Sequence, residues 1–335
     1  MHNCGSDDLA NRMDAEMPLP LVSIVTPSYN QGRFLRRAID SVLSQDYPHL
    51  EYFVLDGGST DESADILRSY SIVPSASGKG AAQSPTSPFG KGAAQSLPSP
   101  SGRGDEGERK SFFWLCQPDR GQTDAINQGL RRTRGDILAY LNSDDVLLPG
   151  AIAAVVQHFR STPDWDLLYG NAYHIDENDR VLGTYPTAPY EFDRLLQSCC
   201  ICQPAAFWRR RITDRVGLFD ESLHYAMDYE YWMRIDRAGG KLVHVPEFLA
   251  CSRLYAQTKT LSARMQVYHE ILEVSRRHAD DASFSQYYAY WHHRCHERRD
   301  GWPRWLRWMP QCHWWLAVAH RRLRLKRQGD RVIRS

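Results

Sequence analysis

The chain has 335 residues, of which 42% are hydrophobic, enough for one large α/β domain with appendages or for two modest domains. Its 41 Lys and Arg residues nearly balance 40 Asp and Glu residues, so the overall charge does not indicate a nucleic-acid-binding protein. We find neither the apolar segment of a signal peptide nor a run near the roughly 20 apolar residues of a spanning helix. A cytoplasmic protein is therefore expected.

The first part of the chain alternates between strand and helix patterns. Leu21–Thr26 is a β-branched run that Pro27 ends, and Phe34–Leu43 has apolar residues at helical spacing. A second strand, Glu51–Leu55, and a second helix, Asp61–Tyr70, follow. Strands and helices that alternate at this spacing predict βαβ units with right-handed connections, and therefore a parallel sheet.

Two segments fall outside this pattern. Residues 1–18 are polar, and residues 74–110 consist mainly of Ser, Pro, Gly, Lys and Ala, with the heptapeptide GKGAAQS beginning at Gly78 and again at Gly90. Such segments bury too little apolar surface to offset the entropy lost on ordering. We expect a disordered N-terminus and a disordered insertion, the latter either a tolerated surface loop or a partner-binding segment.

The alternation resumes after the insertion and continues through most of the chain. Phe112–Leu115 and Asp136–Leu141 are expected strands, Thr123–Arg132 is the helix between them, and a further helix begins at Pro149. These elements extend the same parallel sheet.

The last part of the chain changes character. Asp228–Ala238 has helical spacing, Lys241–Val245 returns as a strand, and the chain beyond residue 262 is expected to be helical. The predicted fold class is α/β, with a mixed, mainly parallel sheet flanked by helices over residues 19–255. A helical C-terminal extension covers residues 256–335.

Polar, turn-forming clusters follow three of the expected strands and begin at Pro27, Asp56 and Asn142. Ligands of an open parallel sheet bind outside the carboxyl ends of its strands, so three clusters at one edge predict a cleft. Helix N-capping could explain single aspartates in these clusters, but it does not explain Asp56 and Asp144 together.

Three stretches of sequence match one known family in order and at compatible spacing. They are TPSYNQGRFLRRAIDSVLSQDYPHLEYFVLDGGSTDES, PDRGQTDAINQGLRRTRGDILAYLNSDD and MDYEYWMRI. Together they resemble family 2 glycosyltransferases of the GT-A fold over residues 20–255, with the insertion as the main departure. The resemblance implies a metal-dependent enzyme that transfers a sugar from a nucleotide-sugar donor to an acceptor hydroxyl with inversion.

The resemblance also implies a donor pocket. Asp56 would accept a hydrogen bond from the nucleobase, and because uracil is the usual base in similar enzymes, UDP is the expected nucleotide. Six further residues would line the nucleoside side or close over the ribose and diphosphate: Pro27, Tyr29, Asn30, Arg120, Asp124 and Asn127.

Asp144 and Asp145 occupy the position of the family's DxD motif, here written SDD. The resemblance implies that they hold Mg²⁺ or Mn²⁺ against the donor diphosphate, and leaves open which carboxylate ligates directly. The chemistry independently favours such a pair. The departing nucleoside diphosphate carries about three negative charges, which a hard cation with oxygen ligands neutralises.

Asp228 resembles the catalytic aspartate of the family, which deprotonates the acceptor hydroxyl. Met227 stands where an acidic residue usually precedes it, Glu230 is a rival base on another helical face, and Asp228 could alternatively cap the helix that follows. Gln203 is expected near the donor sugar or the acceptor. A single displacement by an activated hydroxyl inverts the anomeric carbon, and no second nucleophile for a retaining path is evident.

The stretch SRLYAQTKTLS is similar to a loop that follows the last strand of related enzymes. Arg253, Tyr255, Thr258 and Lys259 lie in it, and its basic groups would contact the diphosphate once the loop closes. The alternative is an ordinary solvated loop.

The C-terminal tail combines tryptophan with positive charge. Residues 301–335 contain nine Arg or Lys and one acidic residue, with Trp302, Trp305, Trp308, Trp314 and Trp315 among them. This composition suits a membrane interface, so the tail is expected either to contact the inner face of the membrane or to pack against the domain. Its aromatic residues cluster with prolines rather than on a sheet platform, which argues against nucleic acid as a partner.

Several activities fit an acidic α/β cleft. The expected partners are a nucleotide-sugar donor and a glycan or lipid-linked acceptor, in polysaccharide or cell-envelope glycan synthesis. The alternatives are a nucleotidyltransferase, which normally carries a Gly-rich, basic phosphate loop that PSYNQGRF lacks, and an inactive sugar-binding or scaffold protein of the same fold. The four intact aspartates argue against the scaffold: Asp56, Asp144, Asp145 and Asp228.

Overall fold

The structure is a computed structural model that describes residues 18–71, 94–96, 109–297 and 314–323. The expectation of disorder in the N-terminus and in most of the insertion therefore lies outside the described residues, as do Trp302, Trp305 and Trp308. Within the insertion, residues 94–96 are described and form a short strand that pairs with residues 111–113.

The described strands form one ten-stranded mixed sheet, in the order β3-β4-β2-β1-β5-β9-β7-β10-β6, with β8 paired to β7. Parallel pairing joins β4, β2, β1 and β5, and also β7 and β10, which confirms the expected mixed, largely parallel sheet. The bounds are β1 Val22–Ser28, β2 His49–Asp56, β3 Ala94–Ser96, β4 Arg109–Cys116, β5 Ile137–Tyr140, β6 Val146–Leu147, β7 Leu167–Ile175, β8 Val181–Thr184, β9 Ala206–Arg209 and β10 Leu242–Arg253.

Helices cover both faces of the sheet, and each face has its own apolar core. One core joins β1 and β2 to α2, α3 and α5, and the other joins the opposite face to α4, α7 and α8. The bounds are α2 Gly32–Leu43, α3 Ser63–Ser71, α4 Gln122–Leu130, α5 Ala151–Ser161, α6 Phe192–Gln197, α7 Arg210–Val216, α8 Met227–Arg237, α9 Lys259–Ser262, α10 Arg264–His278 and α11 Phe284–Glu297.

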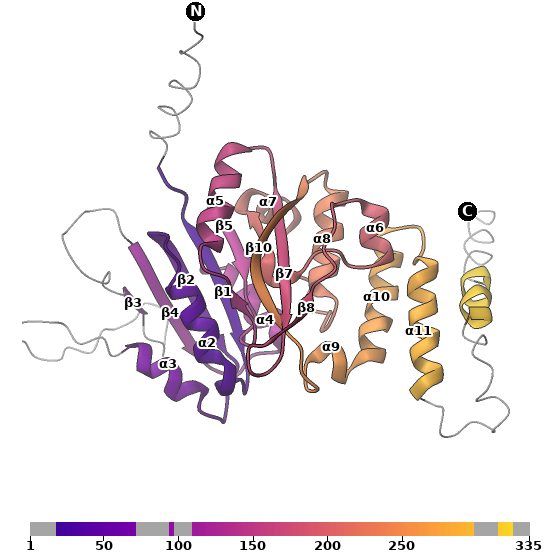
Figure 1. Ribbon diagram of the computed structural model, residues 1–335, viewed down its shortest axis with the longest axis horizontal. Coiled ribbons are helices and arrows are strands. Elements are labelled where there is room, and N and C mark those ends of the chain that lie inside the picture. The colour runs from indigo at the N-terminus through magenta and orange to yellow at the C-terminus, as the bar shows by residue number, and fades with distance from the viewer. Residues whose placement is uncertain (1–17, 72–93, 97–108, 298–313, 324–335) are drawn as a thin grey trace, which may run out of the picture.

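The helices form because their apolar residues recur on one side. In α2, for example, Phe34, Leu35, Ala38, Ile39 and Val42 are all buried at helical spacing. The C-terminal helices α10 and α11 lie at the end of the molecule opposite β3 and β4 (Figure 1), and a further helical stretch spans residues 314–323. In the part of the chain that the structure describes, no helix has the length and apolar character needed to span a membrane.

Two elements differ from the sequence-based expectation. The helix expected to begin at Pro149 begins at Ala151, after Gly150 with a φ of +78°. The strand expected over Lys241–Val245 runs on as β10 to Arg253. Pro246 has no N–H to donate, and the pairing with β7 shifts register between His244 and Phe248 before the ladder resumes. The strand pattern is lost there, although the strand itself continues.

The sheet order places a crevice at the ends of β1 and β5. β1 pairs with β2 on one side and with β5 on the other, so the chain winds outward in both directions from this point. Open α/β sheets bind ligands where the strand order reverses in this way. Ser28 ends β1, and Asn142 to Asp145 follow β5 after one intervening residue, Leu141.

Candidate active site

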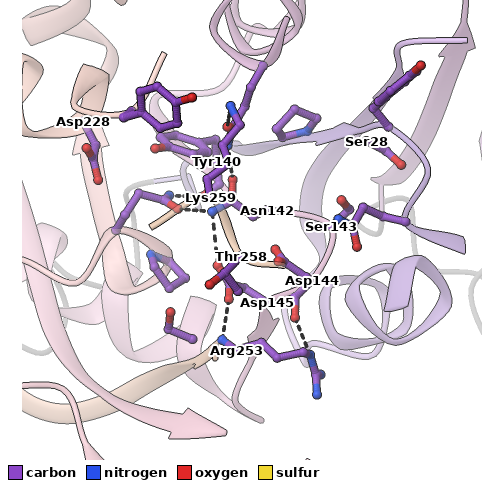
Figure 2. A pocket seen from close by; sticks show the side chains of 18 of the residues that line it. Ser28, Tyr140, Asn142, Ser143, Asp144, Asp145, Asp228, Arg253, Thr258 and Lys259 are labelled. Atoms are coloured by element: carbon purple, nitrogen blue, oxygen red, sulfur yellow. Dashed lines mark hydrogen bonds between the residues drawn. The ribbon is translucent and has the colours of Figure 1, made fainter. Parts of the chain in front are cut away.

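A cavity of about 930 Å³ lies at this crevice. Segments after β1, β2, β4 and β5 form one side, and α8, the end of β10 and α9 form the other. Ten of the residues named from the sequence line it: Pro27, Tyr29, Asp144, Asp145, Gln203, Asp228, Arg253, Tyr255, Thr258 and Lys259. In the view of Figure 2, Asp228 and Ser28 lie on opposite sides of the pocket, with Asp144 and Asp145 between them.

The acidic pair is held by donors on three sides. Asp145 is buried, and its carboxylate accepts hydrogen bonds from the backbone N–H of Arg253 (2.8 Å) and the amide of Asn142 (3.2 Å). The hydroxyl of Tyr255 donates to the Asp144 carboxylate at 2.9 Å. Burial raises the pKa of both carboxyl groups, and the charge of Asp144 raises that of Asp145 further. A nearby cation would relieve this cost of ionisation.

The donor chemistry of the pair fits a hard divalent cation. Both ligands are carboxylate oxygens that face a cavity large enough for phosphate groups. In the described part of the chain, no group of three or more His, Cys, Asp or Glu side chains is arranged to hold a metal by itself. Mg²⁺ and similar ions are commonly held by one or two carboxylates, with substrate phosphates and water completing the shell. Asp144 and Asp145 supply that number.

Asp228 lies in the first turn of α8, where the helix faces the cavity. Its carboxylate accepts a hydrogen bond from the backbone N–H of Tyr229 at 2.8 Å. Burial raises the pKa of Asp228 to about 6, against the opposing effect of that N–H. A half-buried carboxyl group with a pKa in this range can accept a proton near neutral pH. Tyr231, Trp232 and Ile235 are fully buried and anchor α8 in the core.

Glu230, the rival to Asp228, does not line the cavity. It is buried, and Arg234 donates to its carboxylate at 2.7 Å from Nη2 while His278 lies 3.0 Å away. Burial alone would raise the pKa of Glu230, but these two partners outweigh it and the pKa is lowered. Glu230 therefore links α8 to α10 and has no direct path to an acceptor.

Asp56 and Asn30 brace the wall beside the nucleoside side of the cavity. Asp56 is 2% exposed, and its carboxylate accepts hydrogen bonds from the N–H of Ser59 (2.8 Å) and of Gly58 (3.2 Å). Asn30, with a φ of +52°, accepts from the N–H of Thr60 at 2.9 Å. Neither side chain lines the cavity, whereas the neighbouring Gly58 does.

Arg120, Asp124 and Asn127 also lie outside the cavity lining. Arg120 pairs with Asp124 at 2.9 Å, and this hydrogen bond lowers the pKa of Asp124 to about 2. Asn127 donates to the carbonyl of Phe219 (2.9 Å) and accepts from its N–H (3.0 Å). These contacts fix α4 to the segment that leads into α8.

A chain of amide hydrogen bonds crosses the cavity from α9 to β5. Lys259 Nζ donates to Gln122 (2.7 Å), whose amide donates to Asn142 (2.7 Å). Asn142 donates to Gln203 (3.1 Å), and Gln203 donates to the carbonyl of Tyr140 (2.7 Å). Each amide is thereby held in one orientation at the point where α9, α4 and the acidic pair meet.

Asp119 is a cavity residue that the sequence reasoning missed. Its carboxylate accepts the N–H of Gly121 at 2.8 Å, and burial raises its pKa. A Cβ at Gly57 would stand 2.8 Å from Asp119 Oδ2, so a larger residue there would displace the Asp119 carboxylate. Asp119 lies inside the stretch PDRGQTDAIN that resembles the family, which was the available signal.

The sheet order and the position of the cavity are those of the GT-A fold, as two solved glycosyltransferase structures show. The mannosyltransferase PcManGT of Pyrobaculum calidifontis, solved with GDP-Man and Mn²⁺, matches with a TM-score of 0.55 at 15% identity, over 93% of this chain and 79% of that chain. TarS of S. aureus, solved with UDP-GlcNAc, matches with a TM-score of 0.53 at 16% identity, over 89% of this chain and 79% of that chain.

The chain belongs to glycosyl transferase family 2, whose sequence model matches residues 23–84 and 111–217. Chondroitin synthase of Escherichia coli is similar, with 25% identity over 221 residues, which are 66% of this chain and 27% of that protein. The protein is therefore a transferase enzyme. The family match ends before Asp228, so the candidate base lies beyond it.

Proposed function

We propose that the protein transfers a sugar from a nucleoside-diphosphate sugar, with UDP as the expected nucleotide, to a hydroxyl of a glycan or lipid-linked acceptor. The observation that carries this proposal is that one cavity contains both the acidic pair and the half-buried Asp228. Synthesis of a polysaccharide or cell-envelope glycan is the expected context, which the similarity to chondroitin synthase supports.

In the proposed reaction Asp228 acts as the general base. As the acceptor oxygen bonds to the anomeric carbon, its proton passes to the Asp228 carboxylate and the bond from that carbon to the diphosphate oxygen breaks. A single displacement of this kind inverts the anomeric centre. A cation held by Asp144 and Asp145 would neutralise the charge that builds up on the departing nucleoside diphosphate.

Lys259 is the basic group best placed to contact the diphosphate. It lines the cavity, and its ammonium group is held by Gln122 Oε1 and by the carbonyl of His224. Partial desolvation by the surrounding protein lowers its pKa, although the residue as a whole stays solvent-accessible. No carboxylate forms an ion pair with Lys259 among the described residues, so its charge is available to an anionic ligand.

A peripheral membrane contact is proposed for the helix over residues 314–323. Trp315 and Leu323 are each 62% exposed and Arg322 is exposed, whereas Trp314 also packs against Phe284 with ring centroids 6.1 Å apart. An exposed indole beside cationic side chains suits the headgroup region of an anionic bilayer. We expect Trp315→Ser to weaken sedimentation with phosphatidylglycerol vesicles, and binding unchanged by that substitution would contradict the contact.

The reaction class can be tested without knowing the acceptor. Purified protein would be incubated with a panel of nucleotide sugars and Mn²⁺ or Mg²⁺, with EDTA as the metal-free comparison. We expect slow release of UDP from one donor, dependent on the cation and lost in Asp145→Ala. If no donor binds or reacts while the protein is folded, the donor proposal fails and the sugar-binding or scaffold alternative replaces it.

A further inference from the structure

Arg253 ends β10 beside the acidic pair, where the sequence had suggested a diphosphate contact or a solvated loop. Its side chain has no exposed surface, so the guanidinium group does not reach the cavity as a free cation. It lies over the ring of Phe34 with 4.5 Å from Cζ to the ring centroid. A buried cation is costly unless hydrogen bonds and opposite charges compensate it.

The partners of Arg253 lie on two separate segments. On the first, its Nε donates to the carbonyl oxygen of Asp144 at 2.7 Å, and its own backbone N–H donates to the Asp145 carboxylate at 2.8 Å. On the second, its Nη1 donates to the carbonyl oxygen of Asp176 at 2.5 Å, and Nη2 lies 2.6 Å from the carboxylate of Asp179. Arg253 therefore joins the acidic pair to the turn between β7 and β8, residues 176–180, through its side chain and its own backbone N–H.

This β7–β8 turn has a fixed conformation of its own. The Asp176 carboxylate accepts the N–H groups of Asn178 (2.8 Å) and Arg180 (2.9 Å), and Asp179 has a φ of +65°. Two ion pairs fix the turn to α2: Arg33 with Glu177 at 2.9 Å, and Arg37 with Asp179 at 3.0 Å. The turn is thus a defined anchor rather than a free loop.

We propose that Arg253 is a positioning residue that fixes the main chain of Asp144 and Asp145 against the β7–β8 turn, and so sets the affinity of the site for its divalent cation. The proposal rests on the proposed function, since it concerns the same acidic pair. Groups that orient metal ligands commonly change metal affinity about 10- to 100-fold when they are altered. Asp179 does not contact the acidic pair, and it contributes by holding the guanidinium group of Arg253 in place.

The turn offers a matched pair of variants. Asp179→Asn and Glu177→Gln each remove one negative charge from the same turn and one surface ion pair to α2. Only Asp179→Asn also removes the ion pair to Arg253, and asparagine tolerates the left-handed conformation at this position. Arg253→Lys keeps the positive charge but loses the planar fork that reaches both segments.

The measurement is the Mn²⁺ affinity of each variant by titration calorimetry in saturating UDP, together with UDP affinity in EDTA. We expect Mn²⁺ binding to weaken by about 10-fold or more in Arg253→Lys and by a smaller factor in Asp179→Asn. Glu177→Gln should match the wild type. UDP affinity in EDTA should stay unchanged throughout, which a general disruption of the cavity would not allow.

The outcomes separate this inference from the proposed function. Equal Mn²⁺ affinity in Asp179→Asn and Glu177→Gln, with wild-type binding intact, overturns the positioning role of Arg253 alone. A wild type that takes up no Mn²⁺ with UDP overturns the proposed function and this inference with it. Should Arg253→Lys fail to fold, the comparison of the two turn variants still decides the question.

Discussion

The two sides of the cavity are built in different ways. On the nucleoside side, Asp56 is bonded to Gly58 and Ser59, so the loop after β2 is fixed by residues within three positions. On the opposite side, Lys259 meets Gln122, and Arg253 meets Asp145, across more than 100 residues of chain. Local contacts leave a motif in the sequence, whereas contacts of the second kind appear only when the chain has folded.

Helix α10 is part of this second side. The carboxylate of Glu270 accepts hydrogen bonds from the consecutive N–H groups of His224 (3.0 Å), Tyr225 (2.7 Å) and Ala226 (2.9 Å), just before α8 begins. It satisfies donors at a helix N-terminus that otherwise lack partners. The candidate base thus depends on a helix beyond residue 255, where the catalytic domain was expected to end.

Replacement of the candidate base should give the largest effect on turnover. It should affect only the side of the cavity that contains α8 and leave the binding of UDP and Mn²⁺ unchanged. We expect Asp228→Asn to lower turnover of the reactive donor by about 100- to 10,000-fold, because the acceptor proton loses its destination. Binding of UDP and Mn²⁺ should stay unchanged, since neither needs Asp228. Initial rates of UDP release and calorimetric titrations measure the two quantities.

Glu230→Gln is the matched comparison for this substitution. Glu230 is two residues away but faces Arg234 and His278, so its substitution should leave turnover within a few-fold of the wild type while weakening the link to α10. If turnover falls more in Glu230→Gln than in Asp228→Asn, Glu230 rather than Asp228 is the base.

A smaller effect is expected at Lys259, which joins the two sides. Lys259→Met should weaken binding of UDP by about 10- to 100-fold, because a hydrogen bond from a charged group to the diphosphate is lost. Lys241→Met is the control, since Lys241 is an exposed lysine that pairs with Asp164 at the surface. Equal UDP affinity in the two variants would show that Lys259 does not contact the diphosphate.

The sequence predicted the mainly parallel sheet, and it singled out the acidic pair and Asp228, because each belongs to a short stretch with its own pattern. It did not predict Arg253 as a buried group, because Pro246 interrupts the strand pattern that delivers it. Of the two partners of Glu230, Arg234 is a neighbour one turn along the same helix, whereas His278 comes from another helix and leaves no local pattern. The assigned roles of the site residues remain predictions.

The pH dependence of turnover tests the environment of Asp228. Its pKa is raised to about 6 by burial, and the base must be ionised to accept a proton. At saturating Mn²⁺, turnover should therefore fall about tenfold per pH unit below about pH 6. Mn²⁺ affinity must be followed at each pH, because acid also protonates Asp144 and Asp145. If the residual turnover of Asp228→Asn still falls below about pH 6, another group is responsible for the pH dependence.

The smallest effect concerns stability, which Asp228→Asn should increase although the same substitution lowers turnover. The pKa of Asp228 is higher in the folded protein than the value of about 4 in an unfolded chain, so folding favours the protonated form. Ionised Asp228 is therefore a cost above pH 6, and this cost disappears as the pH falls through 6 towards 4. Asp228→Asn should raise the free energy of unfolding by about 1 to 2 kcal/mol at pH 8 and by almost nothing near pH 4. Urea unfolding of wild type and variant at the two pH values measures this difference. A variant that is less stable than the wild type at pH 8 would show that Asp228 stabilises the fold as a helix cap, and not that its ionisation destabilises the folded protein.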